Sequence, residues 1–187
     1  MSAQEQIIKE CQKGNLDEFT ELYEQYFEKI YRFIYYKTHH QQTAEDLTSQ
    51  VFIKTLENIG RFNPRKGLFS SWLYRIARNK VIDYYRTAKS EFDITGFWDL
   101  KSVEKIEADL ENKEKLEQVK QYLDKLKPEQ REIIVMRVWD GLSYQEIAEI
   151  IDKSEANCKM IFSRTMRKLR EEKSFALLVL LVARYLV

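Results

Sequence analysis

The stretch from residue 142 to residue 170 reads LSYQEIAEIIDKSEANCKMIFSRTMRKLR. Ser143 and Glu146 stand at the spacing of a capping box, in which each residue caps a free backbone N–H at the start of a helix. An Asp-Lys pair at residues 152–153 breaks this helix, and Ser154 is placed to cap the next one. The pattern predicts a helix-turn-helix.

The second helix of this motif carries two different faces. Its apolar positions predict core residues: Cys158, Phe162, Met166 and Leu169. A different face, basic and amide-bearing, carries Asn157, Met160, Arg164 and Arg167, with Lys159 and Ser163 beside it. A helix of this kind suits the major groove of duplex DNA. A solvated, charged helix of a bundle would have the same pattern.

The rest of the chain also favours helices. Only five Gly and two Pro interrupt its 187 residues, and apolar residues recur at helical spacing. Helices are predicted over residues 17–37, from Thr43 to about residue 58, from Ser70 or Ser71 to Arg86, and from Pro128 onward. The predicted fold is all-α, with two small helical domains joined by a flexible linker. The domains are residues 1–90, a linker 91–120, the helix-turn-helix unit 121–173 and an apolar tail 174–187.

Charge is distributed in blocks, although the net charge is only +1. Residues 1–60 carry a net −4, residues 61–89 a net +7, residues 90–152 a net −7 and residues 153–173 a net +4. Two basic blocks separated by acidic ones indicate two contacts with a polyanion.

The first basic block contains FSSWLYRIARNKVIDYYR, residues 69–86. Phe69, Trp72, Leu73 and Ile76 predict an inward face, whereas Arg75, Asn79, Asp83 and Arg86 share another. Tyr74, Tyr84 and Tyr85 interleave aromatic rings with this charge. Because a duplex hides the faces of its bases, the mixture suits single-stranded or melted DNA, where rings stack on bases at about 1–3 kcal/mol each. The alternative is a cationic helix whose tyrosines belong to the core.

One helix face has the character of a protein-contact surface. Asp46, Ser49, Gln50 and Ile53 form a polar, acidic strip, and carboxylates repel phosphate. A merely solvated face would look the same.

Catalytic readings find little support. Adjacent His39 and His40 point about 100° apart on a helix, so they predict a solvated turn and not a metal pair. The glycines are scattered singly and form no phosphate loop. We therefore expect no enzyme, cofactor or metal. Cys11 and Cys158 lie far apart, which indicates free thiols in a reduced, cytoplasmic compartment.

The apolar stretch FALLVLLVARYLV, residues 175–187, is shorter than the roughly 20 residues that span a bilayer. A terminal helix packed on the protein is the simplest interpretation. Peripheral membrane contact or a partner helix are the alternatives.

In this order, the segments resemble the extracytoplasmic-function (ECF, group IV) sigma factors of bacterial RNA polymerase, over about residues 19–87 and 123–171. TAEDLTSQVFIKTLENIGRF (residues 43–62) resembles their polymerase-binding segment. Residues 69–86, especially WLYRIARN, resemble the helix that melts and reads the minus-ten element. LDKLKPEQREIIVMRVWDGLSYQEIAEIIDKSEANCK (residues 123–159) resembles the region that reads the minus-thirty-five element.

The resemblance implies partners and residue roles. Core RNA polymerase would be contacted by Asp46, Gln50 and Phe52. The loop 63–67 would form the lip of a pocket for a flipped minus-ten base, with Asn79 beneath it. The residues implied in minus-ten binding are Asn63, Arg65, Lys66, Trp72, Arg75, Arg78, Asn79, Lys80 and Arg86. The minus-thirty-five residues would be Asn157, Lys159, Met160, Ser163, Arg164 and Arg167. An anti-sigma protein is a further partner that the family implies.

Two departures from the family pattern stand out. Ser49 replaces the usual Gln, and Gln50 follows where an acidic residue is usual. The recognition helix also begins differently from the common Gly-Thr-Val-Lys-Ser-Arg, with ANCKMI at residues 156–161. Two other functions remain open: a stand-alone helix-turn-helix regulator, and a sigma-like decoy that binds polymerase without promoter activity.

Overall fold

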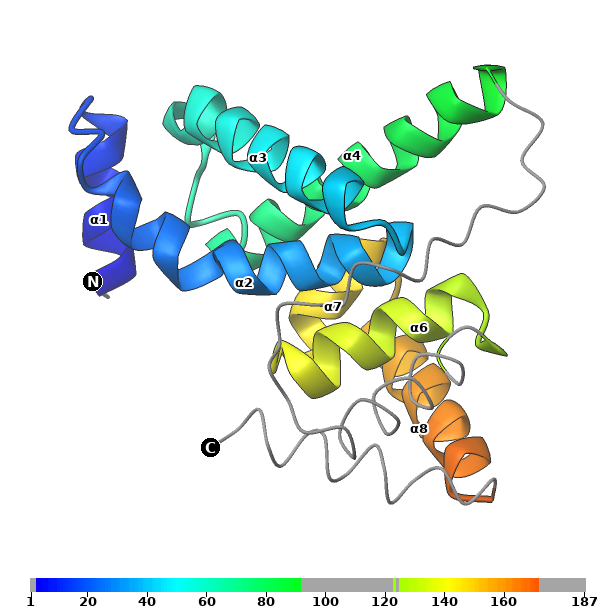
Figure 1. The fold of residues 1–187 in the computed structure, drawn as a ribbon. Coiled ribbons are helices and arrows are strands. Elements are labelled where there is room, and N and C mark those ends of the chain that lie inside the picture. Colours follow the sequence, from blue (N-terminus) through cyan, green and yellow to red (C-terminus); the bar gives the residue numbers. More distant parts are fainter. Residues whose placement is uncertain (1–2, 92–122, 124, 172–187) are drawn as a thin grey trace, which may run out of the picture. The chain divides into compact units, whose positions relative to one another are not determined.

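The computed structural model describes residues 3–91, 123 and 125–171. The chain divides into two compact units, Met1–Ser102 and Val103–Val187, which are described separately. Every regular element in the described part of the chain is a helix, so the all-α prediction is confirmed (Figure 1). All but the first residue of the predicted linker 91–120 lies outside the described residues. The tail 174–187 lies outside them entirely. None of the described helices is long and apolar enough to cross a membrane.

The N-terminal unit is built on three long helices. Its elements are α1 (Ala3–Gln12), α2 (Phe19–Thr38), α3 (Gln41–Asn58), the 3-10 turn η1 (Ile59–Arg61) and α4 (Phe69–Glu91). α2 packs against both α3 and α4, and α3 also packs on α4. Their shared core contains the fully buried side chains of Leu22, Ile30, Phe33, Ile34, Leu73 and Tyr74. This packing fixes which faces of α3 and α4 remain exposed.

The helix ends differ in places from the predictions. His39 adopts a left-handed conformation (φ 53°) that ends α2, and the Nδ1 of His40 then accepts a hydrogen bond from the N–H of Thr43. α3 therefore begins two residues earlier than predicted, with His40 as its cap. At its other end the α-helix stops at Asn58, as predicted, and the chain then tightens into η1, a 3-10 turn that contains Gly60. α4 begins at Phe69, before the predicted start at Ser70 or Ser71, and both serines are buried inside it.

The C-terminal unit contains α6 (Pro128–Ile134), the π-helical stretch η2 (Val135–Trp139), α7 (Tyr144–Ile151) and α8 (Glu155–Glu171). Pro128 occupies the first turn of α6, where its missing N–H costs nothing. The helix predicted from Pro128 onward ends before Asp140 and Gly141, and its last turn widens into η2, which the sequence pattern did not indicate.

The helix-turn-helix forms as its local signals predict. Ser143 and Glu146 make both bonds of the capping box, at 3.2 Å and 2.8 Å. Asp152 adopts a left-handed conformation (φ 58°) at the break between the helices. The hydroxyl of Ser154 then accepts a bond from the N–H of Asn157 at 3.2 Å. Thus α7 and α8 are fixed at their junction by the residues that the spacing indicated.

The inner face of α8 is partly as predicted. Cys158 and Leu169 are buried, whereas Phe162 and Met166 are only half-buried. Thr165, which the apolar pattern did not identify, is fully buried and donates its hydroxyl to the carbonyl of Ile161 at 2.8 Å. Because this hydroxyl is satisfied within the helix, burying it costs little.

Candidate polymerase and nucleic-acid interfaces

The strip predicted on α3 is a real surface. Asp46, Ser49 and Gln50 are exposed, and 58% of Ile53 is accessible to solvent. The polar strip thus ends in a large exposed apolar side chain, a combination suited to contact with another protein.

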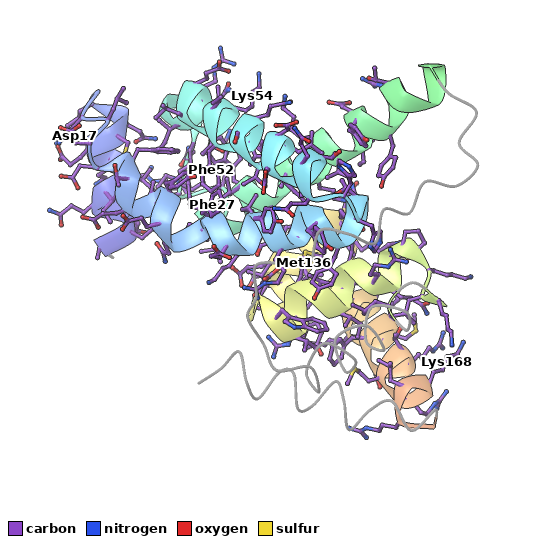
Figure 2. The ribbon with its side chains drawn as sticks, viewed as in Figure 1. Asp17, Phe27, Phe52, Lys54, Met136 and Lys168 are labelled. Atoms are coloured by element: carbon purple, nitrogen blue, oxygen red, sulfur yellow. The ribbon has the colours of Figure 1, made fainter. Side chains whose placement is uncertain are left out.

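Phe52, by contrast, does not lie on this surface. It is only 5% exposed, and its ring packs 4.8 Å from the ring of Tyr23 and 6.4 Å from that of Phe27, measured between centroids. Figure 2 shows Phe27 and Phe52 together between α2 and α3. The position predicted to face polymerase is therefore a core position that supports the strip from beneath.

α4 presents the basic face that its spacing predicted. Arg75, Asn79, Asp83 and Arg86 are all exposed. The Nη2 of Arg86 lies 3.0 Å from Oδ1 of Asp83, in a pair open to solvent on both sides. Exposed pairs of this kind contribute little, at most about 1 kcal/mol, so a phosphate can compete for the guanidinium.

Two further basic residues of α4 are less exposed than those of this face. Arg78 and Lys80 are half-buried, and long basic side chains at such positions can pack their stems on the protein and keep their charged heads in water. The Nζ of Lys80 lies 3.3 Å from Oε1 of Gln50 on α3. Lys80 therefore links the predicted DNA-binding helix to the predicted polymerase-binding strip.

The tyrosines of α4 divide into two groups. Tyr74 is fully buried with its ring 5.2 Å from that of Phe33, so the prediction that it interleaves with the surface charge was wrong. Tyr84 and Tyr85 are 38% and 40% exposed and lie edge to face at 5.3 Å. The hydroxyl of Tyr85 donates to the carbonyl of Lys37 at 2.6 Å. Two rings, and not three, are thus available to stack on bases.

The loop at residues 63–67 is shaped by its own first residue. Oδ1 of Asn63 accepts a bond from the N–H of Arg65 at 2.9 Å, and its carbonyl accepts one from the N–H of Lys66 at 2.9 Å. An Asx turn and a tight backbone turn therefore overlap here, and both begin at Asn63. Arg65 and Lys66 are exposed on it. Asn63 is also exposed, but its side-chain oxygen is already engaged in setting the backbone.

Trp72 lies beside this loop in an aromatic cluster. The ring is half-buried, 5.3 Å from Phe62 and 5.8 Å from Phe69. Phe62 directly precedes the loop and Phe69 opens α4 shortly after it. The cluster therefore joins the two ends of the loop and leaves part of the tryptophan accessible.

The predicted reading face of α8 is open to solvent. Its exposed members are Lys159, Met160, Ser163, Arg164 and Arg167, while Asn157 is half-buried. Figure 2 shows Lys168 projecting outward near the end of the same helix. The face thus combines hydrogen-bond donors with one apolar contact, Met160, which can meet the methyl group of thymine.

Sequence reasoning missed the role of Tyr144. Its ring lies 4.9 Å from the guanidinium of Arg137 and 5.8 Å from the Nζ of Lys159. It also meets the ring of Phe162 edge to face at 5.7 Å. Lys159 in addition pairs with Glu155 at 2.6 Å. Tyr144, the first residue of α7, therefore contacts both η2 and the reading face of α8. The spacing of residues in the sequence does not indicate these contacts, because they depend on how α7 and α8 pack together.

Both cysteines are buried as free thiols, each in its own unit. Burial raises the pKa of Cys11 and of Cys158 above the ordinary thiol value. Within the described ranges, no group of three His, Cys, Asp or Glu side chains is arranged to hold a metal ion.

These two units match known family models. Sigma-70 region 2 matches residues 22–91, and Sigma-70, region 4 matches residues 116–169. The RNA polymerase sigma factor YlaC of Bacillus subtilis is 32% identical over 84% of this chain and 96% of its own length. The ECF RNA polymerase sigma factor BldN of Streptomyces coelicolor is 34% identical over 88% of this chain, which spans 63% of BldN. The chain therefore belongs to the sigma-70 family, among its ECF RNA polymerase sigma factors.

Solved structures share the fold. The sigma factor RpoE of Bartonella quintana, crystallised with the anti-sigma factor NepR, has a TM-score of 0.65 and 22% identity. That match covers 82% of this chain and 95% of RpoE. CnrH, solved with the cytosolic domain of CnrY, has a TM-score of 0.64 and 21% identity, covering 95% of this chain and 96% of CnrH.

Proposed function

We propose that the exposed surfaces of the two units divide the work of promoter recognition. The reading face of α8 binds the duplex minus-thirty-five element, and α4 with the loop 63–67 binds the melted minus-ten strand. The observation that carries this proposal is the difference between the two basic helices. α4 pairs its cations with two exposed tyrosines, whereas α8 carries amide, hydroxyl and guanidinium donors along one open face.

The chemistry of α4 fits a strand whose bases are unstacked. Flipping a base out of a duplex costs a few kcal/mol. Stacking on Tyr84 or Tyr85, at about 1–3 kcal/mol per base, together with capture by the loop would offset that cost. Arg75, Arg78, Lys80 and Arg86 neutralise the phosphates of the strand. The melted state is thereby trapped, whereas the closed duplex gains only the phosphate contacts.

The chemistry of α8 fits an intact duplex. A single helix with Arg164 and Arg167 on its open face can place guanidinium groups against guanine edges or phosphates in the major groove. The affinity of either unit alone need not be high, because polymerase holds both on the same promoter.

The exposed strip Asp46, Ser49, Gln50 and Ile53 is the surface that we assign to core polymerase. An acidic and apolar strip is unsuited to nucleic acid and sits on α3, beside the DNA-binding helix. We also propose an anti-sigma protein as a partner that would cover polymerase-binding surfaces, supported by the complex of the related RpoE with NepR. The cytoplasm, where core polymerase works, is the proposed location.

The test is run-off transcription from genomic fragments with core polymerase, with and without this protein, followed by mapping of transcript starts. We expect new starts that share two upstream elements at a constant spacing. Polymerase binding without new starts would favour a decoy, and palindromic duplex binding without polymerase would favour a stand-alone regulator.

A further inference from the structure

Helix α1 packs against α2 and η1 but lies outside the matched region 2, which begins at residue 22 (Figure 1). Its buried residues, Ile8 and Cys11, explain how it attaches to the unit. They do not explain two glutamine side chains, one near each end of α1, that bond to residues far away in the sequence.

The first is Gln12, at the C-terminal end of α1. Its Nε2 donates to the carbonyl of Ile59 at 2.9 Å and to the carbonyl of Phe62 at 2.8 Å. The carbonyl of Ile59 also accepts the N–H of Phe62 at 3.1 Å, which closes η1, so Gln12 is a second donor to it. The carbonyl of Phe62 lies just beyond η1, where an outside donor fixes the direction in which the chain leaves the turn. Here the chain leaves directly into the loop 63–67.

The second is Gln4, near the start of α1. Its Nε2 donates to the hydroxyl of Tyr26 at 2.6 Å, and the ring of Tyr26 packs edge to face on Phe69 at 5.6 Å. Phe69 is the first residue of α4 and follows the loop closely. α1 therefore reaches one end of the loop directly and the other through a single intervening side chain.

We propose that α1 is a brace for the loop 63–67, and that Gln12 and Gln4 are positioning residues for capture of the minus-ten base. This inference rests on the proposed role of the loop. A loop whose two ends are held in place loses less conformational freedom when it closes on a base, so more of the contact energy appears as affinity. Neither glutamine needs to touch DNA.

The test uses holoenzyme, assembled from core polymerase and the full chain, with a promoter recovered by the run-off assay. The probe is a minus-ten single-strand oligonucleotide, either intact or with an abasic site at the captured position. Gln12→Ala and Gln4→Ala are compared with Gln6→Ala, a matched change of an exposed glutamine on the same helix. Gln12→Glu, which keeps the length but has no amide donor, is a further variant of the same contact.

We expect Gln12→Ala and Gln12→Glu to weaken binding of the intact strand by about three- to tenfold, the usual effect of losing one or two neutral hydrogen bonds. Gln4→Ala should act in the same direction, and Gln6→Ala should match the wild type. On the abasic strand all variants should bind with the same affinity. That strand lacks the base that the loop captures, so residues that only position the loop for this capture cannot change its affinity.

Equal weakening on the intact and abasic strands would overturn the inference, since it would reveal general damage to the unit. Wild-type affinity for both strands in Gln12→Ala and Gln12→Glu would also overturn it. These failures are distinct from failure of the proposed function. In that case the wild type itself would not distinguish the intact strand from the abasic one.

Discussion

The ammonium of Lys80 on α4 donates a hydrogen bond to the side-chain oxygen of Gln50 on α3, 3.3 Å away. The bond joins the surface assigned to DNA with the surface assigned to polymerase. Because Gln50 is neutral, Lys80 is held in place without being neutralised. Its full charge remains available to a phosphate.

Gln50→Glu should therefore weaken DNA binding by the holoenzyme. A carboxylate at this position would pair with Lys80 and compete with the phosphate, so the slope of log affinity against log salt should fall by about one. Ser49→Glu adds the same charge one residue away and serves as the control. Equal slopes for Gln50→Glu and the wild type would show that Lys80 does not contact a phosphate.

Asn79→Ala should impair melting more than assembly. Asn79 is exposed on the basic face of α4, and neither the core nor the strip on α3 depends on it. We expect polymerase affinity to stay unchanged while open-complex formation, followed by permanganate reactivity of unpaired thymines, falls about tenfold or more. Parallel loss of polymerase binding and melting would remove Asn79 from the minus-ten site.

The parts of this fold that were predictable depend on local spacing. The capping box at Ser143 and Glu146, and Pro128 at the start of α6, act within one helical turn, so a single segment of sequence contains their whole physical cause. The exposed faces of α4 and α8 follow from helical periodicity in the same way. These signals also located most of the candidate DNA-binding residues.

The sequence predictions failed, or found no signal, where contacts between segments far apart in the sequence determine whether a side chain is buried or what it bonds to. Tyr74 was predicted as a surface ring, but it is buried because Phe33 of α2 packs against it. Gln12 bonds to carbonyls 47 and 50 positions away, which no periodicity can indicate. Helical periodicity in the sequence distinguishes the faces of a helix. Which of these faces is buried depends on the neighbouring helices.

Both thiols should react slowly in the folded protein. Burial raises the pKa of Cys11 and Cys158, so the folded state favours the neutral thiol. Their contribution to stability is fully present below the unfolded pKa of about 8.5 and is lost as pH rises through the higher folded pKa. The rate of labelling by a disulfide reagent at pH 8 should rise sharply on adding denaturant. The single variants Cys11→Ala and Cys158→Ala show how fast each of the two thiols is labelled. Rapid labelling of the native protein would contradict the prediction.

Arg164→Ala should weaken contact with the upstream element. Its side chain is exposed in the middle of the reading face of α8. We expect weaker footprint protection of the minus-thirty-five element and a salt slope lower by about one if the contact is a phosphate. Arg170→Ala, the same change near the end of α8, is the matched control. An unchanged footprint and slope would remove Arg164 from the interface.

Tyr144→Leu should loosen the contact between α7 and α8. The ring lies 4.9 Å from the guanidinium of Arg137 and 5.8 Å from the ammonium of Lys159, and it packs edge to face on Phe162. Removing it should cost about 1–2 kcal/mol of unfolding free energy in the C-terminal unit, whereas Tyr144→Phe, which keeps the ring, should cost much less.

Urea unfolding can follow this unit by itself through the fluorescence of Trp139, in a background where Trp72 and Trp98 are replaced by Phe. Lys159→Gln, combined with Tyr144→Leu in a double-mutant cycle, then measures the coupling between the ring and the ammonium. Because the ring stabilises one placement of Lys159, the two changes should be less than additive both in unfolding free energy and in affinity for the upstream duplex. Strict additivity in both would mean that Tyr144 supports the helix packing alone and does not position the lysine.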